Sequence, residues 1–540
     1  MSTLAHTIKT ELSIATNIHP FPTVKQALFN WLDQRASGVL LHPSSLPGEF
    51  GIGTLNDHCL EFIDFLSEAG LKYWQICPLG PTGYGNSPYQ SFSAFAGNPY
   101  LISLRELQAG KLLDPKILDD LAHLPQTFVD YGGLYMSKWA VLDSVYEVFV
   151  QGDQQIRPYG SFTEFKAKHK SWLEPFAYFQ ALKAHFDGKP WYEWSKNLRS
   201  YKDAKSNPLR KELERDIDAQ KFFQYLFYGQ WENVRAHAKT RGVEIIGDLP
   251  IFVALDSADI WQNPEQFQLD PKTGLPTAVA GCPPDYFAED GQLWGNPLYD
   301  WAAMKKDGFK WWVERLNASF DMYDIVRIDH FRGFDTYWSI PYGSPTARIG
   351  EWTKGPGIDF FKAIQKGVRN CKLIAEDLGE LCDTVDQLRA DTGLPGMSVL
   401  QFAFDEDSSN IYLPHNLDPN TVIYSGTHDN DTTIGWYANA PTKTKDSVRR
   451  YYEVSGENIG WDFIRSCFQS VAKLAIFPLQ DLFSLGSEAR FNTPGAAENN
   501  WEWRYEVDDL QQLRDGSTQY LRDLGDRYNR TTHKDPTAPI

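Results

Sequence analysis

The central part of the chain contains the stretch Asp324-Ile325-Val326-Arg327-Ile328-Asp329-His330-Phe331-Arg332-Gly333. Its β-branched residues form a short apolar run that ends at a charged residue before a glycine, which is typical of a buried strand whose last residue leaves the sheet. Arg327 precedes Asp329 by two residues, so on a strand both side chains face the same side. We therefore expect Arg327 to favour the ionised Asp329 and to lower its pKa, although a purely structural ion pair would give the same pattern.

Two later stretches repeat this pattern. Residues 371–376 form a short apolar run that ends at Glu376, and residues 421–429 contain a third run that leads to Asp429. Enzymes with parallel sheets place their active sites at the carboxyl ends of the strands, so neighbouring strands would bring these acids together. The sequence therefore predicts an active site built from carboxylates.

Strand-like segments alternate with helical periodicity along the whole chain. Eight strands are expected, at residues 38–42, 72–78, 243–250 (with Asp248 near its end), 324–329, 371–376, 398–404, within 421–430 and at 475–479. This alternation predicts an α/β fold, a single (β/α)8 TIM barrel over residues 1–540.

Large insertions interrupt the predicted barrel. Residues 103–240 carry long amphipathic helical patterns with aromatic residues at i, i+3 and i+4, which predicts a helical insertion subdomain between strands 2 and 3. Residues 255–300 are expected as a loop insertion over the active-site cleft, able to hold Asp285 there. A short helix is expected at residues 24–35, and residues 80–100 favour a binding loop over a packed surface loop.

Composition and charge narrow the class of substrate. The formal net charge is −18, which argues against nucleic acid and anionic membrane surfaces, because both require clustered Lys and Arg. Aromatic residues make up 14% of the chain, and the excess weakly favours carbohydrate over simple helix packing. Six scattered cysteines, no secretory signal and no membrane-spanning run predict a soluble cytoplasmic protein.

The motifs present favour acid–base chemistry without a cofactor. No phosphate-binding loop, dinucleotide glycine signature, HExxH helix or Gly-X-Ser-X-Gly turn occurs. His42, His330 and His428 lack the spacing of metal ligands, so we expect neither a metal nor another cofactor.

Cleavage of a glycosidic bond needs one ionised and one protonated acid. Asp329 beside Arg327 fits the nucleophile. Glu376 follows an apolar run without an adjacent cation, so burial could raise its pKa toward about 6 and keep it a general acid. Asp429 would then bind sugar hydroxyls and oppose the positive charge of the transition state, with His428 as a nearby donor.

These motifs resemble a known family. Residues 326–333, Ala375-Glu376-Asp377-Leu378-Gly379 and Thr427-His428-Asp429-Asn430, together with residues 83–99 and 283–287, look like the motifs of 4-α-glucanotransferases of the amylomaltase (disproportionating enzyme) family, glycoside hydrolase family 77. The similarity extends from about residue 38 to residue 504. It implies the barrel of the α-amylase clan without a C-terminal β-sandwich domain.

The resemblance implies a role for each site residue. Asp329 would be the nucleophile, Glu376 the acid/base and Asp429 the stabiliser of the transition state. The implied substrate contacts are Arg327, His428, Tyr89, Ser87, Trp294, Asp285 and Asp405, with Tyr84 and Tyr135 at a second glucan-contact site. Residues 281–287 look like the family's loop over the cleft, and residues 492–500 like its facing loop.

The implied reaction is retaining transfer of α-1,4-glucan segments between maltooligosaccharides, with glucose among the acceptors, by a monomer or weak homo-oligomer. Two alternatives remain open at this stage. One is an α-glucan hydrolase or cyclising glucanase with the same chemistry, which would release reducing sugar or form mainly cyclic products. The other is a non-catalytic glucan-binding protein, against which the presence of all three acids counts.

Overall fold

The computed structural model describes residues 27–152, 155–284, 289–379, 382–405, 407–496 and 498–531, without the side chains of Tyr84, Asp120 and Gln155. Eight parallel strands form its centre, in the order β11-β8-β5-β2-β1-β14-β13-β12. They are β1 (Ala36–Leu40), β2 (Tyr73–Gln75), β5 (Glu244–Leu249), β8 (Ile325–Ile328), β11 (Leu373–Ala375), β12 (Gly396–Val399), β13 (Thr421–Tyr424) and β14 (Leu474–Pro478). The N–H of Ala375 donates to the carbonyl of Pro395 at 2.9 Å, which brings the two end strands together. The predicted (β/α)8 barrel of eight strands is confirmed. The sixth strand was expected at residues 398–404 but lies at Gly396–Val399, and the next three residues form the 3-10 helix η10 (Leu400–Phe402).

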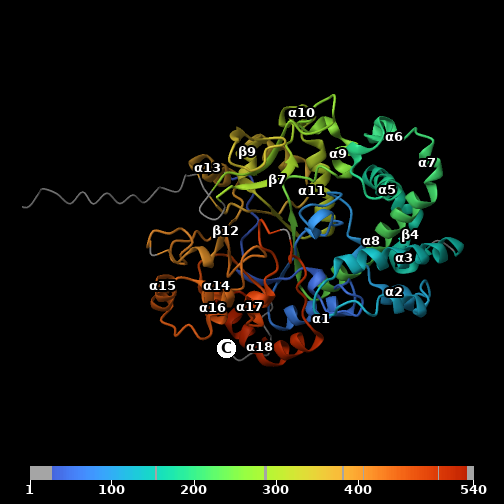
Figure 1. The fold of residues 1–540 in the computed structure, drawn as a ribbon. Helices are drawn as coiled ribbons and strands as arrows, with labels where there is room; N and C mark the ends of the chain where they lie inside the picture. The colour runs from blue at the N-terminus through green and yellow to red at the C-terminus, as the bar shows by residue number, and fades with distance from the viewer. Residues whose placement is uncertain are drawn as a thin grey trace, which may run out of the picture.

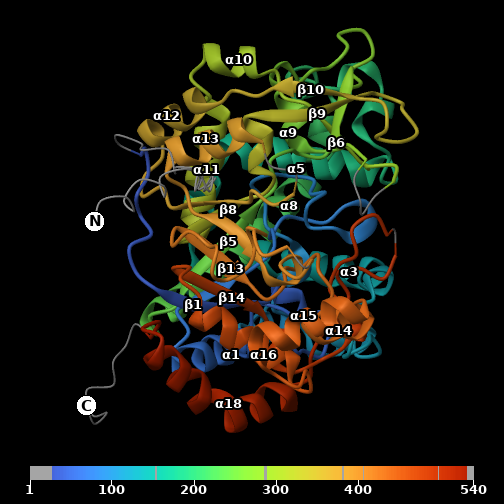
Figure 2. The same cartoon turned by 90° about the vertical axis from the view of Figure 1, so that its left-hand side faces the viewer.

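Helices surround the strands on the outside of the barrel (Figures 1 and 2). Helix α16, for example, lies against β14 and buries one apolar face with Phe463, Ile464, Cys467 and Phe468, which are spaced for one side of a helix. The helices that follow strands are α1 (Asp57–Glu68), α11 (Lys310–Met322), α12 (Ile358–Gly367), α13 (Asp383–Thr392), α14 (Thr433–Asn439), α15 (Thr442–Tyr452), α16 (Ile459–Gln469), α17 (Leu479–Leu482) and α18 (Val507–Arg527).

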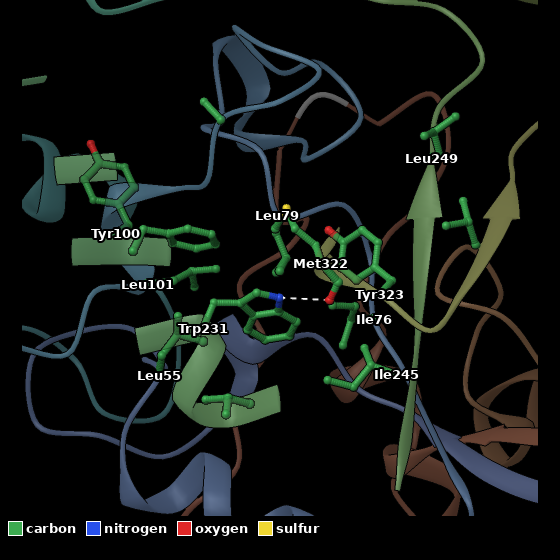
Figure 3. Close-up of a cluster of buried hydrophobic side chains, with 14 of the residues drawn as sticks. Leu55, Ile76, Leu79, Tyr100, Leu101, Trp231, Ile245, Leu249, Met322 and Tyr323 are labelled. Carbon is green, nitrogen blue, oxygen red and sulfur yellow. Dashed lines mark hydrogen bonds between the residues drawn. The ribbon is translucent and has the colours of Figure 1, made fainter. Parts of the chain in front are cut away.

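A group of helices between β2 and β5 lies beside the barrel, at the right of Figure 1. It comprises α2 (Leu104–Ala109), α3 (Tyr131–Gln151), α4 (Phe162–Lys168), α5 (Lys170–His185), α6 (Tyr201–Ala204), α7 (Leu209–Glu212) and α8 (Glu214–Thr240). Helix α8 joins it to the barrel through Trp231, whose indole N–H donates to the carbonyl of Met322 at 3.0 Å (Figure 3). Many aromatic rings of the chain are buried in this way, including Trp74, Trp194, Trp261 and Trp312. Packing therefore accounts for much of the aromatic excess.

A second, antiparallel sheet lies above the barrel strands in Figure 2, with the strand order β10-β9-β6-β7. Its strands are β6 (Ala278–Cys282), β7 (Gln292–Pro297), β9 (Thr336–Pro341) and β10 (Glu351–Lys354). Residues 255–300 were expected as a loop, but they contain two strands, β6 and β7, and the helix α9 (Ala258–Gln262). Helix α10 (Trp301–Lys306) begins directly after this segment. Glycine and proline interrupt these short strands, and β6 pairs with the distant β9, so the local pattern did not reveal them.

The segment before β1 also differs from the expectation. A helix was expected at residues 24–35, but residues 27–35 form neither a helix nor a strand, and residues 24–26 lie outside the description. The N–H of Phe29 donates to the carbonyl of Thr392 at 2.8 Å, so this segment runs along the end of α13. None of the helices in the described parts of the chain is long and apolar enough to cross a membrane.

Candidate active site

Asp329 and Glu376 directly follow neighbouring barrel strands. The N–H of Asp329, just after β8, donates to Leu249 at 3.0 Å, and the N–H of Glu376, just after β11, donates to Ile328 at 3.0 Å. Both residues thus continue the strand pairing by one step before the chain leaves the sheet. This places the two carboxylates at the same end of the barrel, as the sequence predicted.

The carboxylate of Glu376 is held by the backbone around it. It accepts the N–H of His330 at 2.6 Å and the N–H of Leu378 at 3.0 Å. His330 has a left-handed backbone with φ of +52°, which is uncommon outside glycine. The residue after Asp329 therefore supplies a hydrogen bond to Glu376, which ties the two acids together through the main chain.

Arg327 lies between two carboxylates. Its Nη1 is 2.7 Å from both oxygens of Asp248 and 3.1 Å from Oδ1 of Asp329. Asp248, near the end of β5, also accepts the hydroxyl of Tyr89 at 2.8 Å. The guanidinium and the Asp248 carboxylate are both almost fully buried. Arg327 therefore shares its charge between a structural partner and the candidate nucleophile.

Asp429 follows β13 and has partners from two segments. Its Oδ1 lies 3.3 Å from Nε2 of His428 and accepts the side-chain N–H of Asn492 at 2.6 Å. The His428 ring stacks on Tyr89, with ring centroids 5.2 Å apart and an angle of 19° between the planes. Arg490 donates to the backbone carbonyl of Asp429 at 2.7 Å. The segment after β14 thus helps His428 to hold the third acid, through its side chain and its backbone carbonyl.

The environments give the three acids different pKa values. Burial raises the pKa of Glu376 to about 7, and Arg327 and the two backbone N–H groups only partly oppose this. Burial also raises the pKa of Asp329 to about 6 against the effect of Arg327. For Asp429, burial is outweighed by His428 and Asn492, and the pKa falls to about 2. Near pH 7 Asp329 and Asp429 are mainly ionised, and Glu376 is partly protonated.

One expectation about these acids is wrong. The pKa of Asp329 was expected below its ordinary value because of Arg327, and it is raised. Arg327 makes its shortest contacts with Asp248, so it does not fully offset the burial of Asp329 or the nearby charge of Asp248. The expected order, with Glu376 titrating above Asp329, is retained.

Tyr89, Ser87 and Trp294 lie close to the acids or their partners. The hydroxyl of Ser87 accepts the N–H of Tyr89 at 3.2 Å, in the loop after β2. Trp294, on β7, packs its ring edge-to-face with His330, with centroids 4.9 Å apart. The antiparallel sheet therefore contributes an aromatic ring beside the residue that bonds Glu376.

The other predicted contacts lie further out or outside the description. Asp405 is exposed and accepts the N–H of Asp407 at 3.1 Å, and Tyr135 is 65% exposed on α3. Among the described residues, no hydrogen bond, ion pair or ring contact joins either side chain to the three acids. Tyr84 lies in the 3-10 helix η2 (Tyr84–Asn86), but its side chain is outside the description, as is all of Asp285.

Two residues of the site were missed as functional candidates. Asp248 was visible as an acid near the end of a predicted strand, the same signal that marked Asp329 and Glu376. Asn492 belongs to the segment that resembles the family's facing loop, but no local pattern indicated a contact with Asp429. In the parts of the chain that are described, no group of three or more His, Cys, Asp or Glu residues could hold a metal ion.

The comparisons with known proteins agree with this geometry. Residues 41–510 match the family model described as 4-alpha-glucanotransferase. The chain belongs to this family. It is similar to the 4-alpha-glucanotransferases of Synechocystis sp., with 46% identity over 91% of this chain and 98% of that protein, and of Thermus thermophilus, with 47% identity over 87% and 94%.

A solved member of the family has the same fold. The amylomaltase from Streptococcus agalactiae in complex with acarbose superposes with a TM-score of 0.87 at 38% identity, covering 92% of this chain and all of that one. Membership in the 4-alpha-glucanotransferase family confirms the resemblance and the expectation of an enzyme of this type.

Proposed function

We propose that this enzyme transfers α-1,4-glucan segments between maltooligosaccharides by double displacement, with Asp329 as nucleophile and Glu376 as acid/base. In the first step Asp329 attacks the anomeric carbon, the glycosidic bond breaks, and Glu376 gives its proton to the leaving oxygen. In the second step Glu376 takes the proton from the 4-hydroxyl of an acceptor glucan. That oxygen attacks the same carbon, releases Asp329 and restores the original configuration.

The observation that carries this proposal is the contrast between two neighbouring acids. Glu376, with a pKa near 7, can donate and take back a proton at neutral pH, and Asp329, with a pKa near 6, is mainly ionised there. Each acid follows the C-terminal end of its strand, where barrel enzymes hold their reacting groups.

The residues around the acids are proposed to bind the reacting glucose. Asp429, ionised through His428 and Asn492, would oppose the positive charge of the oxocarbenium-like transition state. The ring of Tyr89, already stacked on His428, would pack against the sugar, and Arg327 would orient Asp329.

Further contacts are proposed along the glucan. Ser87 and Trp294 would bind the sugars next to the bond that is cleaved, because Trp294 lies beside His330 and Ser87 beside Tyr89. On the resemblance alone, Asp405 is also assigned to neighbouring sugars, Asp285 to the glucan in the cleft, and Tyr84 and Tyr135 to a second glucan-contact site.

The acceptors are proposed to include glucose. We also propose a monomer or weak homo-oligomer acting in the cytoplasm. Six free cysteines support a reducing compartment, because extracellular proteins tend to pair such thiols.

The test is incubation of the purified enzyme with maltotriose alone, with the products separated by size. Transfer gives glucose and a ladder of longer maltooligosaccharides, and the Asp329→Ala variant gives neither. Glucose and maltose without a ladder would show a hydrolase, mainly cyclic products would show a cyclising glucanase, and unchanged maltotriose would overturn catalysis on this substrate.

A further inference from the structure

The barrel has a weak seam next to Glu376. Between β11 and β12 the described residues form no strand ladder, and a single backbone bond, Ala375 to Pro395 at 2.9 Å, joins the two strands. A side chain continues the connection beyond that point. The carboxylate of Asp377 accepts the N–H of Met397 at 2.7 Å.

Asp377 fits closely into this seam. Its second oxygen forms an ion pair with Arg389 of α13 at 2.9 Å, and the residue is 8% exposed. A Cβ on Gly396 would lie 2.4 Å from that oxygen, so only glycine leaves room for the carboxylate there. Asp377, Arg389 and Gly396 together hold the start of β12 against the end of β11.

Met397, fixed by this bond, points its side chain into the barrel. It packs with the apolar core of the strands, and its sulfur lies 3.3 Å from Nε of Arg327. The guanidinium is buried, so its Nε–H needs an acceptor. A thioether is a weak, uncharged acceptor, which satisfies the Nε–H without competing with Asp248 and Asp329 for the positive charge.

We propose that Met397 is a positioning residue for glucan transfer: its sulfur holds the guanidinium of Arg327 within reach of Asp329, and Asp377 holds Met397. The role in transfer rests on the proposed function. Arg327 is 2.7 Å from Asp248 but 3.1 Å from Asp329, so a guanidinium without its Nε contact would move toward Asp248. Asp329 would then lose part of its favourable interaction.

A displacement of Arg327 from Asp329 would change the pKa values of Asp329 and Glu376. Asp329 is influenced by Arg327 on β8, Asp248 on β5, and both His428 and Asp429 after β13. Of these groups Arg327 favours the ionised Asp329 most, and it also favours the ionised Glu376. A displaced Arg327 therefore raises both pKa values, and that of Asp329 more because the contact is direct.

The first test is the Met397→Leu variant, assayed by initial rates on maltotriose across pH. We expect kcat to fall about tenfold, as for an unsatisfied buried donor beside the reacting group, with little change in KM. The acid limb of the pH profile should move up by about half a pH unit as Arg327 moves away. The matched control is Met304→Leu, on α10, since Met304 is equally buried but away from the site.

A second test uses Asp377. The Asp377→Ala variant should shift the acid limb of the pH profile in the same direction. The shift in the double variant with Met397→Leu should be smaller than the sum of the two single shifts, because both changes release the same guanidinium. Asp377→Asn is the matched control, since its amide oxygen can still accept the Met397 N–H and only the ion pair with Arg389 is weakened. Its acid limb should stay near that of the wild type.

The titration of Asp329 can also be followed without activity. The stability difference between each protein and its Asp329→Asn derivative, measured across pH, reports the pKa of Asp329 in the folded state. A folded Met397→Leu variant with unchanged kcat, pH limbs and Asp329 titration would overturn the inference, as would an equal effect of Met304→Leu. A wild-type enzyme that forms no ladder from maltotriose would instead overturn the proposed function, and the stability titration would still test Met397.

Discussion

Replacing Asp329 by asparagine should stabilise the protein while it abolishes transfer. Burial raises the pKa of Asp329 from 3.8 to about 6 in the folded state. In the unfolded chain the carboxyl ionises near its ordinary value, so between these two pH values the unfolded state loses its proton first. The stability linked to the protonated carboxyl is fully present below about pH 3.8 and is lost as pH rises through about 6. An uncharged amide avoids this loss.

The expected gain follows from the size of the shift. A shift of roughly two pKa units corresponds to about 3 kcal/mol at pH values above 6. The Asp329 side chain is 30% exposed, so water reduces this figure, and the amide gives up some attraction to Arg327. We therefore expect the Asp329→Asn variant to be more stable by about 1–2 kcal/mol at pH 8 and by little at pH 4.

The assay is urea unfolding followed by tryptophan fluorescence at several pH values from 4 to 8. Asp119→Asn is the control, because Asp119 is exposed and far from the barrel strands in the sequence. The gain of Asp329→Asn should grow between pH 4 and pH 6 and then remain constant. A gain that does not depend on pH, or a loss of stability at pH 8, would refute the reasoning that burial of this carboxyl costs free energy.

Three further outcomes are expected. The pH profile of kcat/KM on maltotriose should be bell-shaped, with an acid limb near pH 6 from Asp329 and an alkaline limb near pH 7 from Glu376. A limb more than about two pH units from its expected position would contradict the assignment. Asn492→Ala should raise the pKa of Asp429 by removing its 2.6 Å hydrogen bond and lower kcat about tenfold, whereas an unchanged kcat would exclude this role. Arg530→Ala should lower the thermal midpoint by several degrees, because the buried guanidinium donates to six backbone carbonyls. An unchanged midpoint would show that these hydrogen bonds are dispensable.

The barrel could be predicted because its information is local. Each strand is a short apolar run with its own boundary, and the acids stand at the ends of the runs, so neither required knowledge of distant contacts. Asp329 and Glu376 were placed correctly at their strand ends for this reason. Helices α11 (Lys310–Met322) and α12 (Ile358–Gly367) carry the same kind of local information, since one face of each is clearly apolar.

The antiparallel sheet and the partners of the acids could not be predicted in this way. Strand β6 is stabilised by pairing with β9, which lies beyond Asp329 in the sequence, and nothing in residues 278–282 alone indicates that pairing. The role of Asp248 could not be predicted either, because its ion pair with Arg327 depends on β5 and β8 being neighbours. A cation two residues before Asp329 was visible in the sequence, but the second carboxylate that shares it was not.

Because Arg327 is shared between Asp248 and Asp329, one site can hold two acids with similar pKa values, of which that of Glu376 is the higher. If Arg327 served Asp329 alone, Asp329 would titrate far below Glu376, and its carboxylate would be a weaker base and a weaker nucleophile. Because Asp248 takes part of the charge, Asp329 stays ionised at pH 7 but not strongly stabilised. Among the described residues no cation is in direct contact with Glu376, which is held by two backbone N–H groups, one of them from His330. The buried ion pair of Asp248 and Arg327 thus influences the pKa values of Asp329 and Glu376, which is a reason for this enzyme to retain it.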